Sequence, residues 1–158
     1  MEPLHSLFER SVLLAASPAE VYAFHEDPRN IVKISPPSLR VRGVVCTVPA
    51  RPGQEFRLRV SQFGLPMEWI GFWEEAEPFA RLVDGACKCP FLHWRHHHLF
   101  TAAPGGTLMT DRVEYALPFG MLGRLLDRTV MRVVFAAIFA ARHRATRRFF
   151  EKGKTAGE

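Results

Sequence analysis

The sequence lacks any apolar stretch long enough to cross a membrane, since no segment reaches the roughly 18 apolar residues that a spanning helix requires. The N-terminus, MEPLHSLFERSV, has no basic region followed by an apolar run, so it does not resemble a signal peptide. From these two absences we expect a cytoplasmic protein.

Cysteine is scarce and catalytic motifs are missing. Only Cys46, Cys87 and Cys89 are present, without a CxxC pair, and the alternation Cys-Lys-Cys is more typical of a strand than of a zinc knuckle. We therefore expect structural thiols. The chain has no GxSxG, HExxH or Walker motif, which favours a binding protein over an enzyme.

The chain has 158 residues, 47% of them hydrophobic, which suits one domain with a core and room for a cavity. We predict a single ligand-binding domain over residues 1–158, with a flexible tail from about residue 153. The net charge of +5 comes from the segment after Met121, which holds nine Lys or Arg residues against three acidic ones. No nucleic-acid motif accompanies this charge, so we interpret it as a solvated helix face and expect no nucleic-acid partner.

Helix and strand signals follow one another in a clear order. Residues 7–15 are strand-like, and SPAEVYAF begins a short helix with Ser17 as its N-cap and Glu20 three residues later. A second short helix is expected near 28–34. Six strand-like segments, separated by Pro and Gly turns, then predict an antiparallel meander: RVRGVVC, EFRLRVSQF, PMEWIGFWEE, FARLVDGAC, FLHWRHHHLFTA and TLMTDRVEYAL.

A long helix is predicted from Leu122 to about Lys152. On a helical wheel, one side combines apolar and small residues, and we expect this side to cover the sheet: Leu122, Leu126, Thr129, Val130, Val133, Ala137, Ala140 and Ala141. The alanines either pack closely or leave space between helix and sheet.

This order of elements, together with four motifs, resembles the SRPBCC superfamily of START-like and polyketide cyclase/dehydrase-like ligand-binding proteins. The motifs are SPAEVYAFH (17–25), PPSLRV (36–41), CPFLHWRHHHLF (89–100) and GTLMTDRVEYALPFGMLG (106–123). The resemblance implies an α+β helix-grip fold. In this fold a curved antiparallel sheet of about seven strands wraps around a long C-terminal helix, and two short helices follow the first strand.

The segment HWRHHHLF contains four of the seven histidines of the chain. Because alternate residues of a strand share a face, Trp94, His96, His98 and Phe100 lie together. A face with Trp and Phe points inward, so we predict that His96 and His98 are interior and that His93 and His97 face outward.

The next strand places Asp111 and Tyr115 on the same interior side, and pairing around the APGG turn brings position 98 near position 111. The resulting cluster of His96, His98, Asp111 and Tyr115 has four interpretations. It is a buried structural network, an anchor for the polar end of a ligand, a set of acid/base catalysts, or a metal site. A metal site lacks a third ligand except Asp111, so we predict no metal and no cofactor.

We predict that the protein binds a small hydrophobic molecule, such as a lipid, an aromatic or a polyketide-like compound, between the sheet and the C-terminal helix. The alternative is a cyclase/dehydratase or hydrolase that uses His96, His98, Asp111 and Tyr115. Aromatic side chains support a cavity, although they also suit plain core packing. The expected ligand-binding residues are Trp69, Trp73, Trp94, His96, His98, Phe100, Asp111, Tyr115, Val133 and Ala137.

The wheel leaves apolar residues on the outer face of the helix, among arginines: Met131, Phe135, Ile138 and Phe139. An apolar stripe rimmed by arginines is typical of an interface, so we predict a homodimer through these residues. A partner protein, a peripheral membrane contact or coverage by the N-terminal segment of the same chain are the other options.

Overall fold

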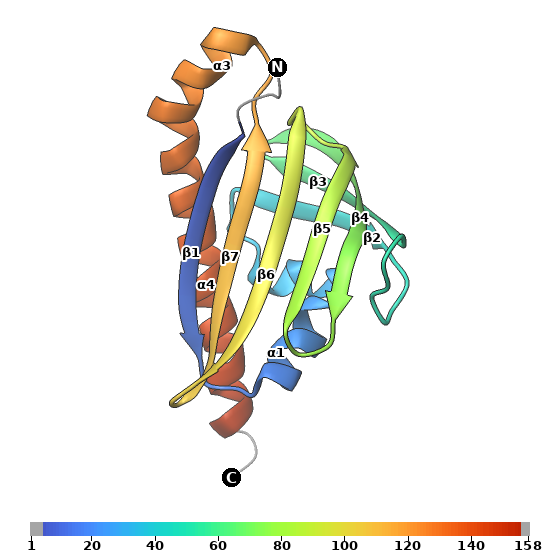
Figure 1. The fold of residues 1–158 in the computed structure, drawn as a ribbon, viewed down its shortest axis with the longest axis vertical. Helices are drawn as coiled ribbons and strands as arrows, with labels where there is room; N and C mark the ends of the chain where they lie inside the picture. The colour runs from blue at the N-terminus through green and yellow to red at the C-terminus, as the bar shows by residue number, and fades with distance from the viewer. Residues whose placement is uncertain (1–4, 156–158) are drawn as a thin grey trace.

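A single antiparallel sheet forms one layer of the protein, and the helices cover one of its faces (Figure 1). The computed structural model describes residues 5–155. The order of strands in the sheet is β1-β7-β6-β5-β4-β3-β2, so the first strand lies beside the last. The strands are β1 (Ser6–Leu14), β2 (Leu39–Val45), β3 (Glu55–Gln62), β4 (Leu65–Glu77), β5 (Arg81–Lys88), β6 (His93–Ala103) and β7 (Gly106–Ala116).

Two short helical segments follow β1, as predicted. Helix α1 (Pro18–His25) starts with a capping box, in which Ser17 Oγ accepts from the backbone N–H of Glu20 and the Glu20 carboxylate accepts from the backbone N–H of Ser17. A 3-10 turn η1 (Pro28–Asn30) leads directly into α2 (Ile31–Ile34). These segments lie behind the middle strands in Figure 1.

The chain ends in a nearly continuous helix made of α3 (Gly120–Leu126), a π-helical turn η2 (Asp127–Met131) and α4 (Arg132–Thr155). It runs behind β1 and β7 in Figure 1. The seven-stranded sheet and this helix confirm the predicted helix-grip fold. The helix continues to Thr155, so the predicted tail is helical at least that far, and residues 156–158 lie outside the described part of the chain.

The face of the C-terminal helix that contacts the sheet is not the predicted one. Phe135 and Phe139 are only 5% and 2% exposed and pack on Val113 and Tyr115 of β7, whereas Val133 is 67% exposed and Ala137 is exposed too. Two phenylalanines bury more apolar area than an alanine stripe does, so the hydrophobic effect turns the aromatic face inward. The predicted positions of Val133 and Ala137 against the sheet are wrong.

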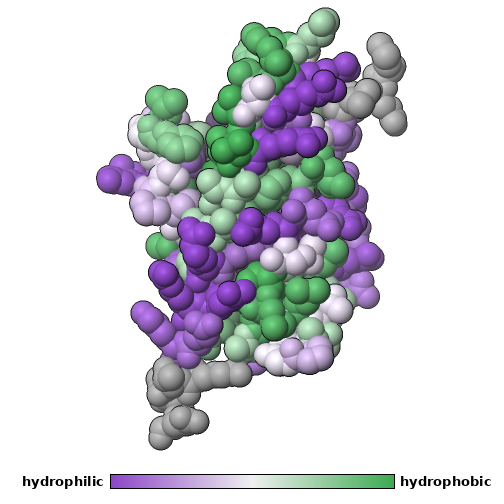
Figure 2. Space-filling view, turned by 90° about the vertical axis from the view of Figure 1, so that its left-hand side faces the viewer, coloured by the Kyte–Doolittle hydropathy of each residue, from purple (hydrophilic) through white to green (hydrophobic). Residues whose placement is uncertain are grey.

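The same rotation removes the predicted dimer surface. Phe135 and Phe139 are core residues, and Met131 and Ile138 line an interior cavity, so these four side chains do not form an outer stripe. Most exposed large apolar residues of the helix lie nearer its start, and Figure 2 shows hydrophobic residues gathered at that end of the molecule. They are Met121, Leu122, Leu125, Leu126, Val130 and Val133, while Phe149 is exposed near the other end of the helix. None of the helices within residues 5–155 combines the length and apolarity needed to cross a membrane.

The orientation of α4 can be tested with a pair of substitutions on the same helix. We expect Phe139→Ala to lower the free energy of unfolding by about 3–5 kcal/mol, because it leaves a cavity in the core. Val133→Ala should change it by less than about 0.5 kcal/mol. Urea unfolding followed by circular dichroism measures both values. A larger loss of unfolding free energy for Val133→Ala than for Phe139→Ala would support the orientation predicted from the helical wheel instead.

Candidate functional site

A cavity of about 520 Å³ lies between the sheet, the short helices and the C-terminal helix. Its walls are mostly apolar. The sheet contributes Phe56, Leu58, Val60, Met67, Trp69, Trp73 and Trp94, the short helices contribute Phe24, Ile31 and Ile34, and the long helix contributes Val130, Met131, Val134, Phe135, Ile138 and Phe139.

The cavity remains open because two packed clusters hold the helices away from the middle of the sheet. One cluster joins the long helix to β7 through Phe135, Phe139, Val113 and Tyr115. The other joins α1 to the sheet through Tyr22, which belongs to a cluster with buried side chains of β1, β3, β4, β5, β6 and β7. The alanine-rich part of the helix is not what creates the space, since the helical wall consists of larger side chains.

The predicted alternation of the histidines on β6 is confirmed. His96 and His98 are 4% and 6% exposed and line the cavity, while His93 and His97 are only half-buried, on the other face. The register between β6 and β7 places His98 directly opposite Asp111, as expected from the turn between the two strands. The interior pair therefore forms the polar part of an apolar wall.

Asp111 is the acceptor that brings these imidazoles together. Its carboxylate accepts from His96 Nε2 at 2.8 Å and from Nε2 of His143, on α4, at 2.5 Å. His98 Nδ1 lies 3.0 Å from the same oxygen as His96 Nε2, as a charge contact without good hydrogen-bond alignment. Side chains from β6, β7 and α4 thus meet at a single buried carboxylate.

A second buried carboxylate, Asp84 on β5, completes the cluster. Its Oδ2 accepts from His98 Nε2 at 3.2 Å and lies 3.6 Å from His96 Nδ1, while its Oδ1 accepts from Trp94 Nε1 at 3.3 Å. Asp84 lines the cavity, whereas Asp111 lies behind the histidines and does not. Asp84 was not among the predicted site residues, although it lies on the same face of β5 as Leu82 and Ala86.

The two carboxylates decide the charge of the histidine between them. Burial disfavours the charged imidazole of His98, but contacts with Asp111 and Asp84 outweigh burial and raise its pKa to about 9. Burial also opposes the charged form of Asp111, yet its bonds to His143, His96 and His98 hold the pKa of that carboxyl well below its usual range. The cluster therefore contains a stable pair of opposite charges at neutral pH.

Two further histidines belong to the same region and were not predicted. His143 follows Phe139 by one helical turn, so a correct wheel would have placed it inside. His25 donates from Nδ1 to the backbone carbonyl of Val21 at 2.8 Å and lines the cavity beside His98. Burial lowers the pKa of His25 to about 3, so this imidazole is neutral.

Tyr115 does not join the cluster, which corrects the expectation for this residue. Its side chain is on the interior face, as predicted, but its hydroxyl donates to Asp127 of the long helix. It packs edge-on against Phe135 and is not part of the cavity wall. Burial and the neighbouring Asp127 raise the pKa of Tyr115, so its hydroxyl stays protonated as a structural donor.

The other predicted ligand-binding residues divide into two groups. Trp69, Trp73 and Trp94 line the cavity, whereas Phe100 is buried against Tyr22 and His25 and does not reach it. Val133 and Ala137, on the exposed side of the helix, do not line the cavity either.

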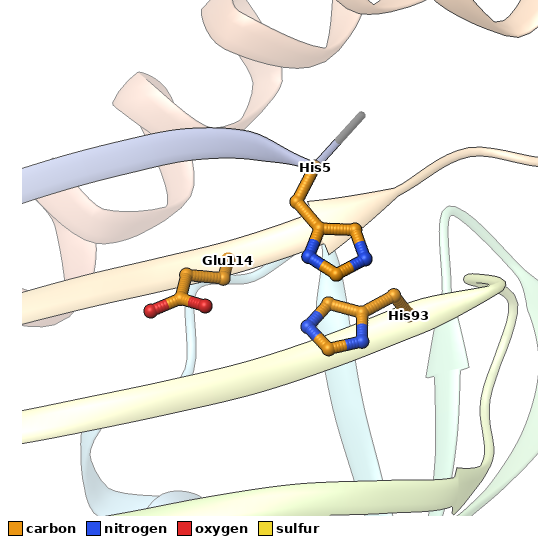
Figure 3. Close-up of side chains that lie close together, drawn as sticks. All are labelled: His5, His93 and Glu114. Atoms are coloured by element: carbon orange, nitrogen blue, oxygen red, sulfur yellow. The ribbon is translucent and has the colours of Figure 1, made fainter. Parts of the chain in front are cut away.

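A second group of histidines lies on the opposite face of the sheet. Figure 3 shows the rings of His5 and His93 one above the other, with Glu114 of β7 beside them. The two rings are parallel, with centroids 3.7 Å apart, and Glu114 accepts from His97 Nε2 at 3.1 Å. We call this group the outer cluster. It has no access to the cavity because the sheet lies between them.

The sequence between the end of β1 and the middle of α4 carries a family signature. A family described as polyketide cyclase/dehydrase and lipid transport matches residues 14–139. The chain belongs to this family. Membership confirms the resemblance to the SRPBCC superfamily, and its description covers both enzymes and carriers. Comparison with curated protein sequences found no significant match.

Solved structures of similar fold support the same architecture. A protein from Nitrosomonas europaea is 15% identical with a TM-score of 0.75, and the match covers 94% of this chain and 96% of that one. A START superfamily protein from Mycobacterium smegmatis is 14% identical with a TM-score of 0.72, covering 94% and 98%. The di-domain ARO/CYC protein StfQ from the steffimycin biosynthetic pathway is 19% identical with a TM-score of 0.78, covering 98% of this chain and 53% of that one. At these identities the likeness concerns the fold.

Removal of the shared carboxylate should destabilise the protein strongly. We expect Asp111→Ala to cost about 3–5 kcal/mol, since it leaves the N–H groups of His96 and His143 without their acceptor and removes one of the two carboxylates that balance the charge on His98. Glu114→Ala, three residues along the same strand on the outer face, should cost less than about 1 kcal/mol. Urea unfolding midpoints test this contrast, and equal midpoints for the two variants would contradict it.

Gly71 offers a separate test of how closely the cavity wall is packed. The space above this glycine is filled by Phe56, whose ring would collide with a Cβ atom at position 71. Gly71→Ala should therefore lower the free energy of unfolding by about 1–3 kcal/mol. Gly153→Ala, where a Cβ meets no atom within 4 Å, should leave stability unchanged or raise it slightly. Thermal unfolding of the two alanine variants measures the difference.

Proposed function

We propose that the protein binds a small, mainly hydrophobic molecule in the cavity between the sheet and the C-terminal helix. The observation that carries this proposal is the cavity itself, about 520 Å³ in volume and lined largely by aromatic and aliphatic side chains. Pockets of some 300–1,000 Å³ with apolar walls and a few placed polar groups are typical of small-molecule sites. Membership of a family described by lipid transport as well as by cyclisation supports the same class of ligand.

The apolar part of the wall favours a ligand with an aromatic or alkyl body. Trp69 and Trp94 meet edge to face, with ring centroids 4.8 Å apart, and Phe91 lies against both. Met67 and Ile138 add flexible aliphatic surface to the same space. Burial of a ligand here is stabilised by about 25 cal/mol for each Å² of apolar surface removed from water.

The polar part of the wall favours a ligand with one oxygen-bearing end. His98 and Asp84 face the cavity as a charged pair, and the neutral His25 lies beside them. Such groups lose hydrogen bonds to water when an apolar molecule fills the space, so a hydroxyl or carbonyl group at this end restores them. We infer that the ligand is amphipathic, with its polar end toward β5 and β6.

An enzyme of the cyclase/dehydratase or hydrolase type is the second candidate. It is favoured by one observation, which is that the imidazoles of His96 and His98 reach the cavity wall together with a carboxylate. His98 would act as the acid, because its pKa of about 9 keeps it protonated at neutral pH. Tyr115 has no part in this candidate, since its hydroxyl is held by Asp127.

The identity of the ligand can be approached with purified protein. Native mass spectrometry and solvent extraction should reveal a co-purifying lipid or aromatic compound of amphipathic character. A carrier returns the compound unchanged, whereas an enzyme converts it on prolonged incubation, and conversion should be lost in His98→Gln.

A side chain that fills the cavity should weaken binding without unfolding the protein. Ile138→Trp projects a larger side chain into the cavity, and we expect it to weaken the binding of an apolar fluorescent dye or fatty acid about 10-fold or more, because the ligand loses the space it occupies. Val133→Trp places the same side chain on the exposed face of the same helix and serves as the control. Fluorescence titration compares the two variants. Equal affinities for wild type, Ile138→Trp and Val133→Trp would rule out this cavity as the binding site.

A further inference from the structure

We propose that Asp84, His96 and His98 bind a divalent transition-metal ion at the wall of the cavity. All three residues are buried, and their candidate ligand atoms lie within 4.8 Å of one another. Two imidazoles and one carboxylate form a donor set that suits zinc, iron(II), cobalt(II) and related ions. This proposal goes beyond the binding of a hydrophobic molecule and does not depend on which molecule is bound.

The spacing of the donor atoms fits one shared ion. Asp84 Oδ2 lies 3.2 Å from His98 Nε2 and 3.6 Å from His96 Nδ1. Ligand atoms at bond lengths of about 2.1 Å from the same ion are separated by roughly 3.0–3.5 Å in octahedral and tetrahedral sites. The two oxygen–nitrogen distances are therefore already close to those around a bound ion, and all three candidate atoms lie within 4.8 Å of one another.

Asp111 orients the two rings for this role. His96 donates from Nε2 to Asp111 Oδ1, so its Nδ1 carries the lone pair that faces Asp84. His98 has its Nδ1 3.0 Å from the same oxygen and its Nε2 toward Asp84. Metal-binding histidines commonly place their second ring N–H against a carboxylate, which fixes the ring and strengthens the bond to the metal. Asp111 is thus a positioning residue for the ion.

Without an ion, the ring nitrogen of His96 that faces Asp84 is close to the carboxylate but not hydrogen-bonded to it. His96 Nδ1 lies 3.6 Å from Asp84 Oδ2, beyond hydrogen-bond range. An ion would bind the lone pairs of both imidazoles and the carboxylate together. It replaces the proton on His98 Nε2, which passes to the buffer.

The site is open on the side where a ligand would lie. All three residues are part of the cavity wall, and Trp94 holds Asp84 Oδ1, which leaves Oδ2 directed toward the histidines. Three protein ligands leave at least one position for another donor. That position suits a water molecule or the hydroxyl or carbonyl oxygen of the hydrophobic molecule.

The outer cluster of His5, His93 and Glu114 is the competing location (Figure 3). Its two rings are parallel within 4°, so their in-plane lone pairs run side by side and do not converge on one point. In the interior cluster the rings of His96 and His98 are inclined by 43°. His93→Ala/Glu114→Gln removes the outer cluster and leaves the interior one intact.

The test uses chelator-treated full-length protein titrated with Zn²⁺ and with Co²⁺, with stoichiometry read by native mass spectrometry and affinity by calorimetry. We expect one ion for each chain in the wild type and in His93→Ala/Glu114→Gln. Asp84→Asn should lower the affinity about 100-fold or more, and Asp111→Asn about 10- to 100-fold. The proposal is overturned if the wild type binds no ion. It is also overturned if His93→Ala/Glu114→Gln loses the ion while Asp84→Asn retains it.

If Asp84→Asn does not fold, a second measurement tests the interior site without any substitution there. In His93→Ala/Glu114→Gln, Co²⁺ should broaden the NMR signal of the Trp94 indole N–H, because that group donates to Asp84 at 3.3 Å. Trp94→Phe assigns the signal. An unaffected signal at saturating Co²⁺ overturns the interior site. Dye binding to the cavity is measured separately with metal-free protein, so failure of one proposal does not imply failure of the other.

Discussion

The buried carboxylate of Asp111 is the constraint on which the arrangement of the interior depends. An unpaired charge inside a protein costs several kcal/mol, so Asp111 must be surrounded by donors. The hydrogen bonds come from His96 on the neighbouring strand and from His143 on the long helix, and His98 adds a charge contact at 3.0 Å. Because these residues are far apart along the chain, satisfaction of one charge ties the helix to the sheet at a defined rotation and height.

This constraint acts together with the aromatic stripe of the helix. Phe135 and Phe139 pack on β7, and His143 follows on the same face and reaches Asp111. Burial of the two rings stabilises the contact between the helix and the sheet. The hydrogen bond from His143 to Asp111 determines which face of the helix points inward. The other half of the sheet is covered by the short helices, and the space between the two contacts is the cavity. The cavity is thus a consequence of where the helix is anchored.

The polar cluster has an inner and an outer layer as seen from the cavity. Asp84, His96 and His98 form the wall, and Asp111 and His143 support them from behind. Binding sites commonly need such a supporting layer, because side chains that meet a ligand must be held in one orientation. A purely structural network would need no access to the cavity. Access of Asp84, His96 and His98 to the apolar cavity supports the proposal that this network meets a ligand.

The sequence by itself determined the order of elements, the antiparallel sheet and the direction of the histidines. These features depend on local regularities: period-two alternation placed His96 and His98 inside, and the turn after Ala103 set His98 opposite Asp111. The capping box at Ser17 is equally local. Such features are predictable because they are decided by residues a few positions apart.

Only the tertiary structure decided which face of the C-terminal helix points inward and which residues complete the polar cluster. The wheel offered an alanine stripe and an aromatic stripe, and the choice depended on the area each buries against a sheet whose shape the sequence does not reveal. Because of that error, Val133 and Ala137 were predicted on the wrong face of the helix, and His143 was not predicted to be interior. Asp84 belongs to the polar cluster, and the Tyr115 hydroxyl donates to Asp127 instead. Strand register and helix position decide both contacts, because they bring together groups that are distant in sequence.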